Sequence, residues 1–213
     1  MLTLPGWVRQ VAVGPLQTNA YLLELGEVVW LIDPGGEGDR LAALLPPEAD
    51  LTVYLTHGHA DHWAGLRVLQ LHRPGLRWYY PRKDEEMITE VDQRLLSFLG
   101  EEDPPECMGL PLEAPQQLVE GGRRFSFLHL PGHTPGHLAI FCEDFPGGSL
   151  LFAGDLLFRR GVGRTDFPGG SLRHLQESLS RLLELPGETV VCPGHGPLTT
   201  INAEREMIEG LLA

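Results

Sequence analysis

Apolar and polar positions divide the chain into short strands and amphipathic helices, separated by turns rich in glycine and proline. Short runs enriched in apolar, β-branched or aromatic residues predict the strands. These runs lie at residues 7–13, 19–25, 27–32, 51–55, 76–80, 117–120, 123–130, 138–142, 149–153 and 188–192. Strands followed by helices recur in both halves in a similar order, without a sequence repeat of fixed period.

Apolar residues at helical spacing predict helices between these strands. The helices are expected at residues 39–45, 63–73, 82–99, 172–185 and 203–212. The helix over 82–99 is predicted from one apolar stripe with residues four apart, namely Met87, Val91, Leu95 and Leu99. Residues 100–115 contain four prolines and are interpreted as a loop and as the plausible internal boundary. Residues 158–170 are interpreted as a second, Gly- and Arg-rich loop.

The turn between the predicted strand 51–55 and the following helix carries a dense cluster of metal-capable side chains: His57, His59, Asp61 and His62. Alternation in extended chain places His57 and His59 on the same side. Asp61 and His62 then swing to a neighbouring point as the helix begins, which suits two adjacent metal ions. Asp61 could alternatively cap that helix, but capping does not explain three histidines within six residues.

Length and composition describe an ordinary globular chain. With 213 residues, 42% of them hydrophobic, it can form a single domain over residues 1–213. The net charge of -13 argues against nucleic-acid binding. Three separated cysteines, Cys107, Cys142 and Cys192, imply no disulfide framework, and Cys192 is expected to be buried rather than reactive. No apolar run could span a bilayer and no signal peptide is evident, so no membrane partner and a cytoplasmic location are expected.

Three later polar residues, His133, Asp155 and His195, each follow an apolar strand and stand next to glycine. Glycine lets the backbone turn tightly and approach a bound group. Together with the first cluster they make five histidines and two carboxylates, a donor set suited to Zn, Fe or Mn.

Other polar residues near these motifs have more than one interpretation. Asp33 ends a strand and is either a turn former or a carboxylate that orients a ligand histidine. His137 is interpreted as a structural residue or as a residue behind the metal ligands. Arg164 is the candidate anchor for a substrate carboxylate, because guanidinium and carboxylate pair bidentately. Whether Arg159 and Arg160 also contact substrate stays open.

The motif His57-x-His59-x-Asp61-His62, followed by His133, Asp155 and His195, resembles the metallo-β-lactamase superfamily over nearly the whole chain. The resemblance implies an α/β fold, a four-layer αββα sandwich with the site at one edge of its two sheets. It also implies that His57, His59 and His133 hold one metal ion and that Asp61, His62 and His195 hold the other. Asp155 would bridge the two ions.

Within the superfamily, the segments Pro131–His137 and Gly163–Gly170 most resemble glyoxalase II in its compact bacterial form. That resemblance implies hydrolysis of an S-2-hydroxyacylglutathione such as S-D-lactoylglutathione, a small acidic thioester. Two divalent ions about 3.5–4 Å apart, Zn first with Fe or Mn as alternatives, would activate a bridging hydroxide that attacks the thioester carbonyl. Asp61 would orient this water or accept its proton. Thiolate leaves readily, and no Gly-x-Ser-x-Gly elbow is present. The oligomeric state stays open.

Other functions within the superfamily are also considered. Persulfide dioxygenases carry a similar Gly-Arg-Thr-Asp-Phe loop, and their single iron would be held by His57, His133 and Asp155. That family typically follows its late histidine with Asp-Tyr, whereas Gly196-Pro197 stands here. A β-lactamase or a ribonuclease of the same fold is a lesser alternative. A non-enzymatic metal module is disfavoured, because a bridged two-metal site leaves positions open for water.

Overall fold

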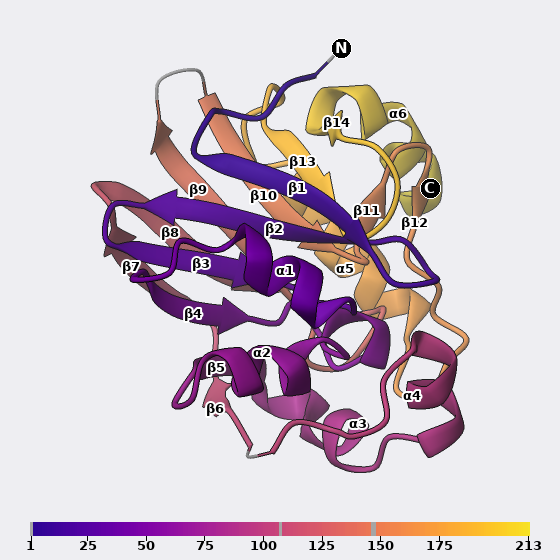
Figure 1. The fold of residues 1–213 in the computed structure, drawn as a ribbon. Coiled ribbons are helices and arrows are strands. Elements are labelled where there is room, and N and C mark those ends of the chain that lie inside the picture. The colour runs from indigo at the N-terminus through magenta and orange to yellow at the C-terminus, as the bar shows by residue number, and fades with distance from the viewer. Residues whose placement is uncertain (1, 107, 146–147) are drawn as a thin grey trace. The chain divides into compact units, whose positions relative to one another are not determined.

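The computed structural model describes residues 2–106, 108–145 and 148–213, and Figure 1 shows its helices and strands. The chain forms two compact units, one of residues 3–112 and one of residues 113–213 together with residue 2. Cys107 lies outside the described residues. The single domain over residues 1–213 stays a prediction.

One six-stranded mixed sheet organises the first unit, with strands in chain order. Its strands are β1 (Val8–Val13), β2 (Thr18–Leu25), β3 (Val28–Ile32), β4 (Asp50–Tyr54), β5 (Arg77–Pro81) and β6 (Leu110–Leu112). The first three form an antiparallel meander, and β3 to β6 pair in parallel. Because parallel strands end at the same edge, the residues that follow β3 and β4 lie side by side, as the hydrogen bond from Asp33 N to Tyr54 O shows (3.1 Å).

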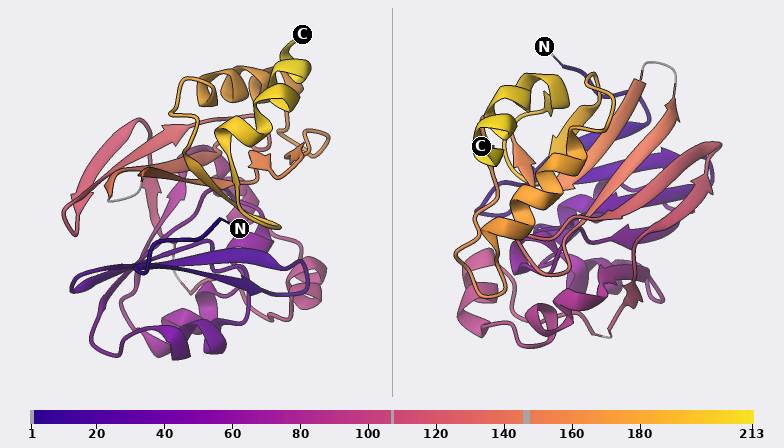
Figure 2. Two further views of the ribbon diagram at one scale, coloured as in Figure 1. Left: turned by 90° about the horizontal axis from the view of Figure 1, so that it is seen from above. Right: turned by 180° about the vertical axis from the view of Figure 1, so that it is seen from behind.

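Two helices cover one face of this sheet, α1 (Gly38–Leu44) and α2 (Leu66–His72). Leu41, Leu66 and Leu69 are fully buried and belong to one apolar cluster with strand residues such as Leu31 and Val53. Figure 2 (left) shows the indigo and purple helices together on one side of the first sheet. This core supports the segment between β4 and α2, where the histidine-rich motif lies.

The single helix predicted over residues 82–99 is wrong. The segment forms a 3-10 turn (Arg82–Asp84) and two short helices, α3 (Glu85–Thr89) and α4 (Gln93–Leu99). The first ends at Thr89, and Asp92 caps the second, because its side chain accepts a hydrogen bond from Arg94 N (2.8 Å). The restart shifts the helical phase, so Leu96 is buried while Leu95, assigned to the buried stripe, is 41% exposed.

A second six-stranded mixed sheet organises the other unit, in the order β14-β13-β10-β9-β8-β7. Its strands are β7 (Gln116–Glu120), β8 (Arg123–His129), β9 (Leu138–Phe145), β10 (Gly148–Gly154), β13 (Val190–Pro193) and β14 (Thr199–Thr200). Only β10 and β13 pair in parallel among the described strands of this sheet. Their parallel ends place the segments after Gly154 and Pro193 at one edge.

Two helices, α5 (Leu172–Leu182) and α6 (Ile201–Leu212), pack over one face of this second sheet (Figure 2). Leu175, Leu179 and Ile208 are fully buried in the same cluster as Leu151 and Val191. The two stretches interpreted as loops contain short strands. β6 lies within residues 100–115, and a hairpin of β11 (Leu157–Phe158) and β12 (Gly161–Val162) overlaps the start of residues 158–170. None of the described helices is long and apolar enough to cross a membrane.

Candidate metal centre

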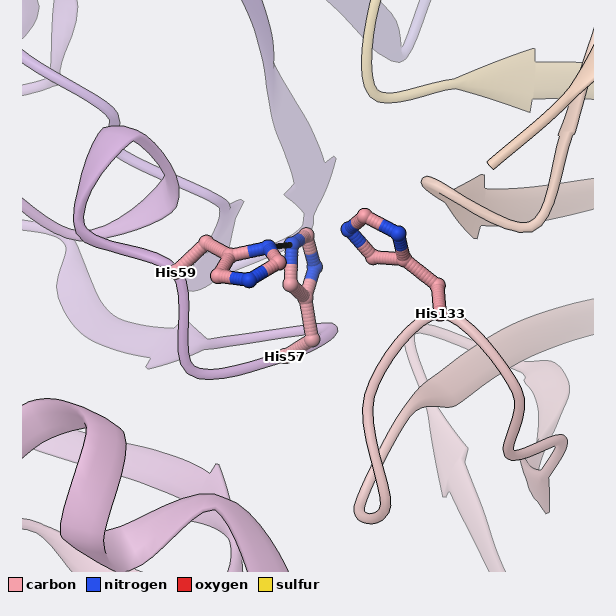
Figure 3. Close-up of side chains that lie close together, drawn as sticks. All are labelled: His57, His59 and His133. Carbon is pink, nitrogen blue, oxygen red and sulfur yellow. Dashed lines mark hydrogen bonds between the residues drawn. The ribbon is translucent and has the colours of Figure 1, made fainter. Parts of the chain in front are cut away.

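In the first unit, four of the predicted ligands lie in the segment between β4 and α2. His57 lies in a bend, His59 is extended, and Asp61 and His62 lie in a 3-10 turn, η1 (Ala60–His62). His57 Nε2 lies 3.1 Å from His59 Nδ1, so the two rings converge at one point (Figure 3). Two nitrogens bound to one tetrahedral Zn²⁺ at its usual distances are about 3.3 Å apart. The pair therefore has the spacing of two ligands of one ion.

Asp33 orients two of these histidines through a buried hydrogen-bond network. Its Oδ1 accepts from Thr56 N (2.8 Å), and its Oδ2 accepts from both Thr56 Oγ1 (2.7 Å) and His62 Nδ1 (2.9 Å). The Thr56 hydroxyl donates to Asp33, so it is left to accept from His57 Nδ1 at 3.0 Å. Both histidines thus carry their proton on Nδ1, and Nε2 of each keeps the lone pair that a metal ion needs.

Asp33 also forms the turn after β3, with a φ of 52° and its carbonyl accepting from Gly35 N (2.8 Å). The structure thus places Asp33 in a turn and also in a hydrogen bond with His62, and its role in orienting a metal ligand stays a prediction. Asp61, by contrast, does not cap α2. The N-cap residue of α2 is Gly65, without a side-chain cap, and Asp61 Oδ2 instead accepts from Thr18 Oγ1 (3.3 Å) and lies 3.7 Å from His62 Nε2.

Gly58, between the two converging histidines, is held on both sides by residues that the sequence analysis missed. Its N–H donates to Asp84 Oδ2 (3.0 Å), and its carbonyl accepts from Trp63 Nε1 (2.9 Å). Both partners are fully buried. No sequence motif indicates this role of Asp84, because it lies in a helical segment 26 residues away from Gly58. The clamp fixes the backbone from which His57 and His59 project.

The second unit brings together its own three predicted ligands at the edge of the second sheet. His133 follows β8, Asp155 follows β10, and His195 follows β13. Asp155 Oδ2 lies 3.6 Å from the Nε2 atoms of both His133 and His195. Asp155 is thus close to both histidines, and its bridging of two metal ions stays a prediction.

His133 and Asp155 are held from behind by atoms of this same unit. His133 Nδ1 donates to the backbone carbonyl of Arg164 (2.8 Å), because a carbonyl only accepts, so Nε2 faces Asp155 with its lone pair. His137 is fully buried, and its Nε2 accepts from Asp155 N (3.2 Å), while its role behind a metal ligand stays a prediction. The role of the Arg164 carbonyl could not be read from the sequence.

The Arg164 side chain is about half exposed and is engaged within its own loop. Its Nε and Nη2 donate to Asp166 Oδ1 (2.7 Å) and Oδ2 (2.6 Å), and its guanidinium carbon lies 3.8 Å from the centre of the Phe167 ring. The hydrogen bonds from Arg164 lower the pKa of Asp166 to about 2, and the same bonds raise the pKa of Arg164. The substrate-anchoring role of Arg164 stays a prediction.

Two histidines outside the predicted ligand set, two arginines and two cysteines complete the description. His72 pairs with Asp39 at the surface (2.7 Å), and His129 Nε2 lies 2.9 Å from the Pro135 carbonyl. Arg159 and Arg160 are exposed. Cys142 and Cys192 are buried and not disulfide-bonded, as expected of Cys192, and burial raises the pKa of the Cys192 thiol.

Residues 13–195 match the sequence profile of the Metallo-beta-lactamase superfamily, a span that includes every predicted ligand. The chain belongs to this superfamily. The resemblance seen in the sequence is thereby confirmed, as is the predicted fold class: an α/β fold with two mixed sheets and helices. Its His and Asp side chains form groups able to hold metal ions, and the protein is a metallo-hydrolase of this superfamily.

Three relatives illustrate the range of the superfamily around this chain. Hydroxyacylglutathione hydrolase GloC of Haemophilus influenzae is 34% identical over 190 residues, which cover 82% of this chain and 83% of the relative. The crystal structure of TTHA1623 in a di-iron-bound form is 42% identical, with a TM-score of 0.79 over 93% of this chain and 97% of that one. The crystal structure of BLEG-1 B3 metallo-beta-lactamase is 31% identical, with a TM-score of 0.80 over 97% and 100%.

Proposed function

We propose that the protein is a metal-dependent thioester hydrolase whose substrate is an S-2-hydroxyacylglutathione such as S-D-lactoylglutathione. The hydrolase proposal is supported by the pre-oriented donor set, in which hydrogen-bond acceptors at Nδ1 hold His57, His62 and His133 so that Nε2 of each can face a metal ion. The similarity to a hydroxyacylglutathione hydrolase supports the substrate class.

We assign the predicted ligands to two ions. His57, His59 and His133 would hold the first, and Asp61, His62 and His195 would hold the second. Asp155 would bridge them, which is supported by its Oδ2 lying 3.6 Å from the Nε2 atoms of His133 and His195. Imidazole and carboxylate donors suit Zn²⁺ and also iron or manganese, and a relative of known structure holds two iron ions.

When bound, two such ions would lower the pKa of a shared water and polarise the thioester carbonyl. The chain supplies orientation and proton handling around that chemistry. Asp61 Oδ2, held by Thr18 Oγ1 at 3.3 Å, is the proposed carboxylate that orients the water or accepts its proton. A thiolate leaves without strong protonation, so a protein acid and a protein nucleophile are both unnecessary.

Arg164 is the proposed partner of a carboxylate on the acidic substrate. Its guanidinium already forms a bidentate pair with a carboxylate, that of Asp166, and this geometry supports the proposed recognition. A substrate carboxylate would therefore exchange with Asp166 rather than meet an isolated arginine.

Hydrolysis of S-D-lactoylglutathione by the purified, metal-loaded protein tests the proposal. We expect saturable release of glutathione that a chelator abolishes and added metal restores. Turnover without metal dependence, or metal-loaded protein without turnover, would contradict the proposal. A parallel reaction with S-acetylglutathione is the matched control for the hydroxyacyl group.

A second candidate, β-lactam hydrolysis, is favoured by the similarity to BLEG-1, which covers nearly the whole chain. The same preparation should be assayed with a chromogenic cephalosporin, and for oxygen uptake with a glutathione persulfide. We expect a kcat/KM for the thioester at least about a hundredfold above that for the cephalosporin, a difference of about 2.7 kcal/mol in transition-state binding. Metal-dependent oxygen uptake without thioester turnover would identify a dioxygenase instead.

A further inference from the structure

The loop between β12 and α5 approaches two of the proposed ligands through its glycine. A Cβ added to Gly163 would lie 1.8 Å from Asp155 O and 3.2 Å from His133 Cγ. Only glycine allows the loop to come this close. The next residue, Arg164, then presents its carbonyl to His133 Nδ1 at 2.8 Å. The position of this carbonyl therefore sets the orientation of a ligand histidine.

Backbone hydrogen bonds pin the two ends of the same loop. Gly163 N donates to Leu156 O (3.3 Å), Gly170 N donates to Phe167 O (2.9 Å), and Ser171 N donates to Gly132 O (2.8 Å). Between these ends, three side chains form a cluster that we call the 164–167 clasp. It consists of the Arg164 guanidinium, the Asp166 carboxylate that it holds at 2.6 and 2.7 Å, and the Phe167 ring beneath it at 3.8 Å.

The clasp closes a ring around the peptide groups that connect Arg164 to Asp166. The carbonyl that His133 uses belongs to one of those peptide groups. A bidentate pair between residues two apart in sequence restricts the backbone dihedrals between them, and stacking on Phe167 restricts the guanidinium further. An isolated exposed ion pair has little effect on stability, but this pair spans the backbone that it restrains.

We propose that the 164–167 clasp positions the Arg164 carbonyl and, through it, the metal-binding nitrogen of His133. Arg164 and Asp166 are thus positioning residues for the metal site in the substrate-free protein, where Arg164 pairs with Asp166 rather than with a substrate carboxylate. This inference rests on the metal site of the proposed function, but not on its thioester substrate.

The test measures Zn²⁺ binding to metal-free protein by competition with a chromophoric chelator. The variants are Asp166→Asn, Arg164→Ala and the two combined. The matched control is Glu177→Gln, which breaks the Arg173–Glu177 pair (2.9 Å) on the surface of α5 in the same unit. Tm and circular dichroism check that each variant folds.

We expect Asp166→Asn and Arg164→Ala each to weaken one of two Zn²⁺-binding steps by about three- to tenfold. This is a smaller loss than the roughly 10- to 100-fold that is typical when the hydrogen-bond partner of a ligand histidine is itself removed. The combined variant should lose no more than Arg164→Ala alone, since both changes open the same clasp. Glu177→Gln should stay within about twofold of wild type. A ¹⁵N spectrum of the histidines should show a weakened Nδ1–H hydrogen bond for one residue.

Results that would contradict the positioning role of the 164–167 clasp can be stated in advance. If Arg164 served only as a substrate anchor, Asp166→Asn would free its guanidinium, lower KM for the acidic thioester and leave both Zn²⁺ steps unchanged. Unchanged Zn²⁺ affinity in Asp166→Asn and Arg164→Ala overturns the clasp. Wild-type protein that binds Zn²⁺ but hydrolyses no thioester overturns the proposed substrate, while the affinity comparison still decides on the clasp. A wild-type chain that binds no Zn²⁺ overturns both.

Discussion

Replacing Asp33 by asparagine should reverse the tautomers of two of the proposed metal ligands, His57 and His62, without removing any buried side chain. The carboxylate, 2% exposed, now accepts three hydrogen bonds, from Thr56 N, Thr56 Oγ1 and His62 Nδ1. In the variant, the amide oxygen keeps the bond from Thr56 N, and the NH₂ group takes the place of Oδ2 as a donor. His62 Nδ1 must then accept, which moves its proton to Nε2.

The same change reaches His57 through Thr56. The Thr56 hydroxyl would accept from the side-chain amide introduced at position 33 and donate to His57 Nδ1, so the His57 proton also moves to Nε2. Each proposed ion thereby loses a prepared ligand. Loss of such support costs about 10- to 100-fold in affinity, or about 1.4–2.7 kcal/mol per ion. The hydrogen-bond count is kept, so the fold should lose only about 1–3 kcal/mol from weaker, uncharged bonds.

The assay is stepwise Zn²⁺ affinity together with the ¹⁵N tautomer pattern of the histidines. Asp50→Asn is the matched control, because it makes the same chemical change at an exposed pair with Arg77 (2.6 Å) in the same sheet. Thr56→Val should weaken only the step that involves His57, since Asp33 still holds His62. Wild-type affinity at both steps in Asp33→Asn would refute the tautomer argument.

Three further predictions concern single side chains. Asp155→Ala should remove bound metal from both sites, since its Oδ2 is shared by His133 and His195; near-normal metal content by mass spectrometry would contradict the bridging role. Burial raises the pKa of Glu101 from 4.5 to about 7, so the folded chain binds this proton more tightly and stability should fall as pH rises from about 4.5 to about 7. Glu101→Gln should reduce that fall in urea unfolding, whereas an unchanged pH slope would show that Glu101 does not cause it. Peptides containing Cys142 and Cys192 should escape thiol labelling in the native state and react only after unfolding, because both are buried; native labelling would contradict this.

Local sequence patterns predicted the strand ends well, because a change from apolar residues to glycine or polar residues marks each end. The apolar run before Thr56 and the glycines beside His133, Asp155 and His195 mark where strands stop. The structure places Thr56, Asp155 and His195 one or two residues after a strand, whereas β8 ends at His129, four residues before His133. The helix over 82–99 failed for a local reason as well. Its four-residue spacing was real, but Asp92 prefers to cap a helix rather than continue one.

Contacts between distant segments were less accessible to sequence reasoning. Asp33 could be singled out because it stands at a strand end beside a turn, but its proximity to the motif depends on the pairing of β3 with β4. Asp84, however, holds Gly58 from 26 residues away, and the Arg164 carbonyl holds His133 from 31 residues away. Backbone acceptors leave no mark on residue type, so no pattern could reveal the second contact. The pairing of Arg164 with Asp166 had a signal, an opposite charge two residues away, but it was overlooked.

The most direct measurement is a Zn²⁺ titration of metal-free protein with binding and S-D-lactoylglutathione hydrolysis followed together. We predict that two equivalents bind per chain and that hydrolysis appears as the second equivalent is taken up. The variant Asp155→Ala should show neither in the same concentration range. Full hydrolysis without added metal, or two bound equivalents without hydrolysis, would contradict the account of this protein as a two-metal thioester hydrolase.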